Sequence, residues 1–136
     1  MHGSCRCGAI AYRVNGALLN VVNCHCHFCR SHTGAAFATY AVIKHSALEI
    51  EQKEQTLAIF AEGEAHKHFC ARCGTPIFNL NPRYPGACML YFGTLADAAT
   101  LAPKANVWCE SQLAWLDRMG ELPAFPQGYE RPRREG

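Results

Sequence analysis

The 136-residue sequence has no long hydrophobic run and little excess charge of either sign. Its longest nearly apolar stretch, residues 35–43, is far shorter than the roughly 20 residues that a membrane-spanning helix needs. Thirteen basic and eleven acidic residues give a formal net charge of +2, too small to favour nucleic acid or an anionic membrane as a partner. We therefore expect neither a membrane nor nucleic acid among its partners.

The chain also lacks the marks of a targeting signal and of a repetitive protein. It opens with MHGSC, without the basic start and apolar run of a secretory signal peptide. No supersecondary unit repeats, and no segment is of low complexity. We expect a cytoplasmic protein with a single domain at residues 1–125, followed by a flexible C-terminal tail at 126–136 that is rich in proline and arginine.

Helical periodicity is weak, so short strands dominate the predicted structure. Residues 9–14 (AIAYRV) alternate in the manner of a strand, and 111–119 is the best helix candidate, with Ser111 before it and Gly120 after it. Further β-branched and aromatic segments predict strands at 19–23, 37–43, 56–60, 66–69, 77–80, 87–92 and 106–109. Together they predict a mostly β fold, a small antiparallel sandwich.

The abundant residue is cysteine, and nine cysteines cannot all pair as internal disulfides. In a reducing compartment, clustered cysteines usually bind metal. Two stand alone in apolar segments, Cys88 and Cys109, and we expect both to be inert core residues. The other seven form three groups: Cys5 and Cys7; Cys24, Cys26 and Cys29; Cys70 and Cys73.

Two of these groups together suit a closed structural zinc site. The C-x-x-C of Cys70 and Cys73, followed by Gly74, is typical of a zinc knuckle. A C-x-C pair in an extended segment points both thiols to one side, so Cys5 and Cys7 would supply the other two ligands. Other pairings of the clusters remain possible on spacing alone.

The third group then remains as a trio: Cys24, Cys26 and Cys29. Catalytic zinc sites commonly have three protein ligands and an open position, which makes an open, catalytic-type zinc the sharpest functional signal here. A histidine, His25, His27 or His32, would close the site if it filled the fourth vertex.

An open zinc with three thiolates suits a soft fourth ligand such as a substrate thiol. Coordination would lower the pKa of that thiol, and the resulting thiolate would attack an aldehyde carbon. Three arginines next to ligand cysteines (Arg6, Arg30, Arg72) would offset thiolate charge, hold a substrate carboxylate or lie as ordinary surface residues. Histidines near the clusters, among them His66 and His68, are not specific enough to name a general acid, so the catalytic residues stay unknown.

Four segments carry a family resemblance: GSCRCGAIAYRV, CHCHFCRSHTGAAF, FCARCGTPIF and NVWCESQLAWLDRMGELPAF. Together they resemble the glutathione-dependent formaldehyde-activating enzyme family, also called the centromere-protein-V family. The resemblance implies a mostly β zinc fold shared in outline with the B-type methionine sulfoxide reductases, and two zinc ions per chain. It implies a structural zinc on the quartet of Cys5, Cys7, Cys70 and Cys73, and a catalytic-type zinc on the trio of Cys24, Cys26 and Cys29.

The resemblance also implies an activity: a carbon–sulfur lyase that joins formaldehyde to glutathione as S-hydroxymethylglutathione. The expected partners are therefore a small thiol, glutathione in the family's reaction, and an aldehyde. One departure is the sequence Asn106-Val107-Trp108, where members often read His-Ile-Trp.

Three competing hypotheses remain open at this point. The first alternative is a non-catalytic zinc module that binds a thiol, a metal or a protein partner. A methionine sulfoxide reductase would need Cys109 as its catalytic cysteine, and a nucleic-acid-binding zinc ribbon would need a basic stripe that the sequence lacks. Residues 35–43 and the aromatics Trp108, Trp115 and Phe125 either line a pocket near the trio or pack in the core.

Overall fold

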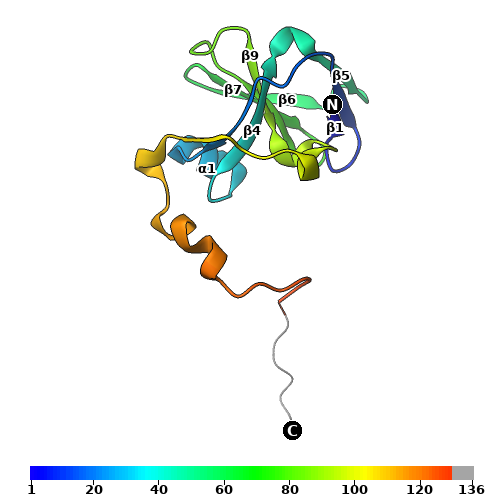
Figure 1. Cartoon of the computed structure of the whole chain (residues 1–136). Coiled ribbons are helices and arrows are strands. Elements are labelled where there is room, and N and C mark those ends of the chain that lie inside the picture. Colours follow the sequence, from blue (N-terminus) through cyan, green and yellow to red (C-terminus); the bar gives the residue numbers. More distant parts are fainter. Residues whose placement is uncertain (130–136) are drawn as a thin grey trace.

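The computed structural model describes residues 1–129, in which short strands predominate (Figure 1). The strands of this part of the chain are β1 (His2–Ser4), β2 (Ile10–Val14), β3 (Asn20–Cys24), β4 (Ala38–Lys44), β5 (Leu48–Gln52), β6 (Leu57–Glu62), β7 (Ala65–Cys70), β8 (Pro76–Leu80), β9 (Ala87–Tyr91) and β10 (Ala105–Val107). The helices are α1 (His27–Thr33) and the 3₁₀ turns η1 (His45–Ala47), η2 (Phe92–Thr94), η3 (Ala98–Thr100), η4 (Cys109–Ser111) and η5 (Ala114–Glu121).

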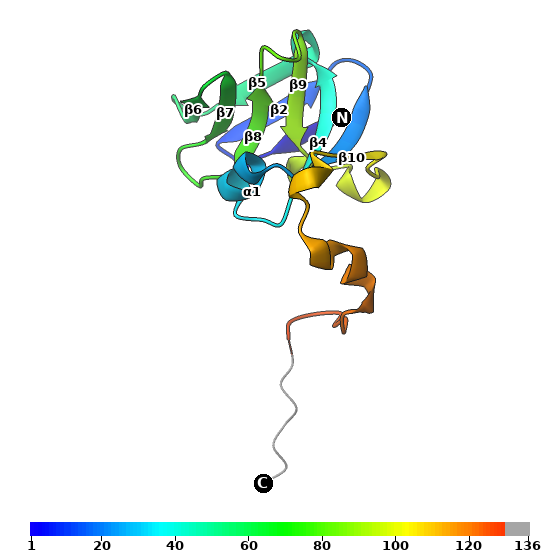
Figure 2. The ribbon, with the colours of Figure 1, turned by 90° about the vertical axis from the view of Figure 1, so that its left-hand side faces the viewer.

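The strands form two sheets that pack as a sandwich. A three-stranded sheet has the order β1-β2-β5, and a seven-stranded sheet has the order β10-β3-β4-β9-β8-β7-β6. Figure 2 shows strands of the smaller sheet behind those of the larger one. Neighbouring strands are antiparallel except for β10, which runs parallel to β3 at one edge. The predicted mostly β, antiparallel sandwich is confirmed, and the parallel edge strand is an addition to it.

The main core lies between the two sheets and follows from strand alternation. In β2, Ile10, Tyr12 and Val14 are buried while Arg13 is exposed, as a period of two requires. The large sheet contributes a facing set of buried apolar side chains: Ala41, Ile43, Ile77, Phe78, Cys88 and Leu90. Burial of these side chains positions the turns that carry the cysteine groups.

Each strand predicted from the sequence is present, with ends displaced by two residues or fewer. Two strands were missed, β1 and β5. In β5, Leu48 and Ile50 are half-buried and alternate with the exposed Glu49 and Glu51. The two-residue period of a strand was therefore present, but the charged residues made it hard to recognise. The helix α1 was also missed, because its sequence HFCRSHT has no apolar periodicity.

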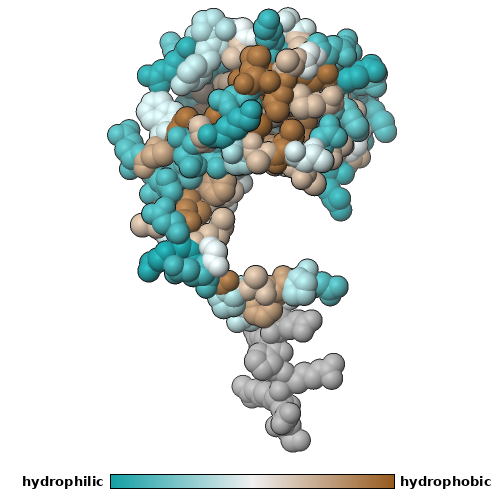
Figure 3. All heavy atoms as spheres, viewed as in Figure 1, coloured by the Kyte–Doolittle hydropathy of each residue, from teal (hydrophilic) through white to brown (hydrophobic). Residues whose placement is uncertain are grey.

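The C-terminal part differs from the prediction. Instead of a helix at 111–119, the chain forms 3₁₀ turns in a segment that leads away from the body (Figure 1). Figure 3 shows hydrophobic side chains exposed along this segment. Trp115, Leu122 and Phe125 are each about half exposed. Core packing, one of the two alternatives left open for Trp115 and Phe125, is therefore wrong for both.

The division into a domain at 1–125 and a tail at 126–136 stays a prediction, and residues 130–136 of that tail lie outside the described residues. Within residues 1–129, no helix is both long and apolar enough to cross a bilayer.

Candidate metal centres and the adjoining pocket

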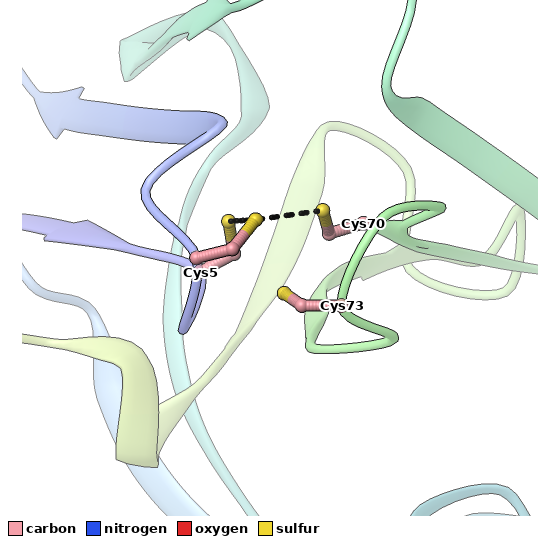
Figure 4. A group of neighbouring side chains, drawn as sticks. Cys5, Cys70 and Cys73 are labelled. Atoms are coloured by element: carbon pink, nitrogen blue, oxygen red, sulfur yellow. Dashed lines mark hydrogen bonds between the residues drawn. The ribbon is translucent and has the colours of Figure 1, made fainter.

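The quartet predicted from spacing is brought together by two turns. Cys5 and Cys7 lie between β1 and β2, Cys70 ends β7, and Cys73 lies in the turn before β8 (Figure 4). All four sulfurs lie within 4.8 Å of one another. The Sγ–Sγ distance is 3.6 Å from Cys5 to Cys7 and 3.8 Å from Cys7 to Cys70. Because zinc–sulfur bonds of about 2.3 Å in a tetrahedron imply sulfur–sulfur edges of about 3.8 Å, the donor set fits a zinc ion.

Matching glycines shape both turns. Gly8 and Gly74 each have φ of 78°, a conformation that side chains with a Cβ disfavour. The Gly74 amide donates to the Cys70 carbonyl at 2.7 Å, and the Gly8 amide donates to the Cys5 carbonyl at 3.2 Å. The C-x-C pair therefore lies in a turn, and the expectation that it is extended was wrong.

Polar contacts tie the two turns together. The Arg6 backbone amide donates to the Thr75 hydroxyl at 3.1 Å, and the same hydroxyl lies 3.1 Å from the Cys73 sulfur. Hydrogen bonds from Thr75 to the sulfur lower the pKa of Cys73 to about 5. These contacts favour the thiolate, the form that ligates metal.

The trio converges from three different structural positions. Cys24 is the last residue of β3, Cys26 caps α1, and Cys29 lies inside α1. Their sulfurs also lie within 4.8 Å of one another, and the Cys29 amide donates to the Cys26 sulfur at 3.3 Å. All nine cysteines of the chain are among the described residues, and all are free thiols. Three soft donors in this arrangement fit zinc from one side.

No histidine, acidic residue or further cysteine joins this group in the described part of the chain. His25, the nearest in sequence, is buried and turned elsewhere. Its Nε2 lies 3.0 Å from the Asn106 side-chain oxygen, and its ring packs 5.2 Å from that of Phe37. The ring of His32 packs 6.2 Å from that of Tyr91. The geometry is that of three protein ligands.

A buried lysine that sequence reasoning missed lies beside the trio. Lys67, on β7, is only 3% exposed, and its ammonium lies 3.8 Å from the Cys29 sulfur and 3.4 Å from the Tyr40 hydroxyl. The Tyr40 hydroxyl in turn donates to the Cys29 sulfur at 3.1 Å. When the Asn79 amide oxygen faces the ammonium, it accepts from Lys67 at 2.7 Å. Every partner of this ammonium is thus an acceptor or a thiolate.

This polar cluster changes the acidity of its members. The pKa of Cys29 is lowered to about 5 by a hydrogen bond with Cys24, by the Tyr40 hydroxyl and by the positive charge of Lys67. Burial lowers the pKa of Lys67, and the charge of Cys29 opposes that effect. The Lys67 ammonium and the Cys29 thiolate stabilise each other's charged forms.

The trio opens into a pocket of about 400 Å³. The pocket is bounded by the outer face of the large sheet, by α1 and by the segment around Trp108, and Lys67 and the three cysteines line one part of it. Trp108 is therefore a pocket residue, one of the two alternatives left open by the sequence. Trp115 and Phe125 lie on the exposed C-terminal segment.

The arginines and histidines near the cysteine groups have different surroundings. Arg30 donates to the backbone carbonyls of Ser111 and His25, which anchors the start of the C-terminal segment to α1. Arg6 and Arg72 are exposed. His66 is exposed, and His68 stacks on Phe78 at 4.0 Å on the core side of the sheet.

The two solitary cysteines have different surroundings. Cys88 is fully buried in β9, as predicted, and burial raises its pKa to about 12. For Cys109 the prediction was wrong: the residue is exposed, because β10 ends at Val107 and Cys109 begins a turn on the surface.

One sequence signal would have found one of the missed residues. Asn79 is a polar residue inside the otherwise apolar strand β8, and such a residue is buried only when it is paired. Lys67 lies between His66 and His68 in β7, so no such contrast marks it. Tyr40 carries no comparable signal, because tyrosine is an ordinary strand residue.

Comparisons with known proteins agree with this geometry. The model of the family described as glutathione-dependent formaldehyde-activating enzyme matches residues 1–111. A Halomonas elongata protein named for that activity is 30% identical over 125 residues, which cover 86% of this chain and 80% of the relative. A crystal structure of a Rhodobacter sphaeroides protein, a structural genomics target, aligns with a TM-score of 0.64 at 25% identity, covering 79% of this chain and 100% of that one.

Proposed function

Because the chain belongs to the glutathione-dependent formaldehyde-activating enzyme family, we propose that it is a zinc-dependent carbon–sulfur lyase acting on an aldehyde–thiol adduct of the S-hydroxymethylglutathione type. The observation that carries the proposal is the contrast between its two cysteine groups. Four sulfurs make a complete ligand set away from the pocket, whereas three sulfurs face a pocket with no fourth ligand from the described residues. Structural zinc sites are closed, and catalytic sites keep a position for substrate.

We assign the structural zinc to Cys5, Cys7, Cys70 and Cys73, and the catalytic-type zinc to Cys24, Cys26 and Cys29. A zinc ion on the trio would lower the pKa of a substrate thiol that binds beside it. In the reaction, the thiol sulfur bonds to the aldehyde carbon, the carbonyl π pair moves to oxygen, and the proton lost by the thiol ends on that oxygen. The reverse reaction breaks the same carbon–sulfur bond.

The chain's own residues support this chemistry in two ways. The Lys67 ammonium lies on the pocket side of the trio and would hold the oxygen as negative charge develops on it. The Tyr40 hydroxyl and the Asn79 amide orient that ammonium, since both lie within hydrogen-bonding distance of it. We assign Lys67 this electrostatic role because its ammonium lies 3.8 Å from the Cys29 sulfur and lines the pocket.

The test compares two matched cysteine replacements. Cys26→Ser should reduce the zinc content from two ions to one per chain and leave the fold intact, because the trio lies at the pocket. Cys70→Ser should unfold the protein, because a structural zinc contributes about 10–16 kcal/mol of apparent binding free energy to folding. Metal analysis and circular dichroism measure both, and equal damage from the two changes would contradict the division of roles.

Activity is measured by exchange spectroscopy on glutathione and formaldehyde. The zinc-loaded protein should exchange label between free and bound formaldehyde faster than the uncatalysed reaction, and Cys26→Ser should not. Two bound zinc ions with no acceleration would instead identify a non-catalytic zinc module.

A further inference from the structure

The outer face of the large sheet, opposite the core, is apolar next to the trio. In a two-layer sandwich this face would normally be polar, because it faces solvent. Here Val22, Val42 and Met89 project from β3, β4 and β9 into the pocket and are only half-buried. Strand register places Val42 opposite Met89, and Val22 opposite Tyr40. These side chains form a continuous apolar floor that leads to the cysteines.

Aromatic side chains form another part of the pocket lining. Trp108 lines the pocket in a left-handed conformation with φ of 59°, which is costly for a bulky residue and persists only where surrounding contacts enforce it. The Arg83 guanidinium stacks over the Trp108 ring at 5.3 Å, so this cation covers the indole at the pocket wall. Phe28, from α1, adds a further aromatic surface.

The Lys67 ammonium, at the end of the pocket next to the trio, is surrounded by aromatic rings. Lys67 lies 4.9 Å from the ring centroid of Phe28, 5.7 Å from that of Tyr40 and 5.9 Å from that of Tyr91. Such packing keeps water away from the ammonium, and a ligand oxygen that enters the pocket would replace one of the three acceptors already around it, from Cys29, Tyr40 and Asn79. The pocket thus has a cation beside the trio and an apolar floor leading away from it. A ligand with a carbonyl oxygen at one end and an apolar body behind it matches that arrangement.

Formaldehyde has no carbon beyond its carbonyl, and glutathione carries two carboxylates and an ammonium. Neither supplies an apolar group for a floor of valine and methionine in a cavity of about 400 Å³. Cavities of this size hold whole organic ligands, whose apolar parts contact such linings. We propose that the preferred carbonyl substrate is an aldehyde with an aromatic ring or an alkyl chain, its oxygen at Lys67 and its apolar body on the floor formed by Val22, Val42 and Met89. This inference rests on the proposed function, since it names the aldehyde for the same reaction.

The first test measures binding without turnover. Benzyl alcohol has the ring but no carbonyl, so it cannot react, and methanol is its one-carbon counterpart. In nuclear magnetic resonance titrations of the zinc-loaded protein, benzyl alcohol should shift the Met89 methyl signal saturably, and methanol should not. Absence of a saturable shift with benzyl alcohol overturns the inference.

The second test changes the floor of the pocket. Val42→Asn should weaken benzyl alcohol binding about tenfold, because two buried methyl groups are worth about 0.8 kcal/mol each. Met89→Gln, which keeps the side-chain length, should also weaken benzyl alcohol binding. It replaces Val42→Asn in this test if Val42→Asn does not fold. Ile59→Asn is the matched control, since Ile59 is exposed on β6 and outside the pocket lining. Equal binding by the floor variants and the control overturns the inference.

The third test separates the inference from the proposed function. With glutathione, the rate constant kcat/KM for benzaldehyde should exceed that for formaldehyde at least tenfold, and Val42→Asn should reduce that ratio. Turnover of formaldehyde with no preference for benzaldehyde overturns the inference and leaves the proposed function standing. Saturable benzyl alcohol binding with turnover of neither aldehyde overturns the proposed reaction and supports the apolar ligand class.

Discussion

At the residue scale, the cysteines are the proposed metal ligands, and neighbouring side chains set how much negative charge the trio can carry. Three thiolates and one Zn²⁺ carry a formal charge of −1. The Lys67 ammonium, 3.8 Å from the Cys29 sulfur and almost fully buried, would offset that charge in a place from which water is excluded.

Lys67→Met is therefore expected to weaken zinc binding at the trio. Methionine keeps the apolar volume, so the fold should survive, but loss of the compensating charge should reduce the zinc affinity about 10- to 100-fold. Competition with a chromophoric chelator measures this, and the quartet zinc should be unaffected. Lys44→Met, at the exposed end of β4, is the control. Unchanged affinity at the trio would show that Lys67 does not compensate thiolate charge.

Tyr12 gives a pH prediction that does not involve metal. Its hydroxyl contacts that of Thr94 at 2.6 Å, and burial raises its pKa from 10.0 to about 12. Between pH 10 and 12 the unfolded chain loses this proton while the folded chain keeps it, so the free energy of unfolding falls by up to about 1.4 kcal/mol per pH unit. The contribution is complete below pH 10.

Urea denaturation at several pH values measures this dependence. Tyr12→Phe should show a shallower decline above pH 10 than the wild-type protein, because the variant has no proton to lose at this position. Tyr84→Phe, at an exposed position, should decline as the wild-type protein does. A decline in Tyr12→Phe as steep as in the wild-type protein would show that Tyr12 ionisation does not contribute.

At the scale of the element, turns rather than strands determine the ligand geometry. The Cys70–Gly74 turn is closed by the Gly74 amide, and the residue has a positive φ with open space where a Cβ would lie. Glycine is required at this position by the left-handed backbone conformation and not by a lack of space for a side chain.

Gly74→Ala is expected to destabilise the protein by about 1–2 kcal/mol, the cost of a left-handed conformation for an L-residue. Gly93→Ala is a matched control, because Gly93 also has open space but no positive φ. Thermal unfolding of the zinc-loaded variants measures the difference. Equal melting temperatures for the two variants would show that the turn accepts a residue with a Cβ at position 74 without strain.

At the scale of the whole molecule, the body and the C-terminal segment are distinct. The quartet, the trio and the pocket, including Trp108, all lie before residue 110. From Ala114 to Tyr129 nearly every side chain is exposed, and the backbone hydrogen bonds there are local.

A chain that ends at Gln112 should therefore keep both metal sites. It retains the Ser111 carbonyl that Arg30 contacts. Metal analysis should show the zinc content of the full chain, and the melting temperature should lie within a few degrees of it. Loss of zinc from the shortened chain would show that the segment after residue 112 supports a site.

Sequence patterns predicted the elements whose signals are local. Alternation located the strand at 10–14, and the spacing of cysteines grouped the seven sulfurs that the fold then brings together. The helix α1 was not predictable from periodicity, because its start depends on a sulfur cap from Cys26 and its end on Gly34 in a left-handed conformation. Lys67 and Tyr40 meet Cys29 only through the order of strands in the large sheet, which no local pattern encodes.

The parallel pairing of β10 with β3 has a consequence for the order of events on the ribosome. The four cysteines of the quartet lie at or before Cys73, and the Thr75 hydroxyl that joins their two turns follows directly, so the quartet can assemble before β10 is synthesised. Cys24, in contrast, sits opposite Val107 at an edge that is covered only when residues 105–107 emerge. We therefore expect the proposed structural zinc to bind the nascent chain before the pocket beside the trio gains its wall around Trp108.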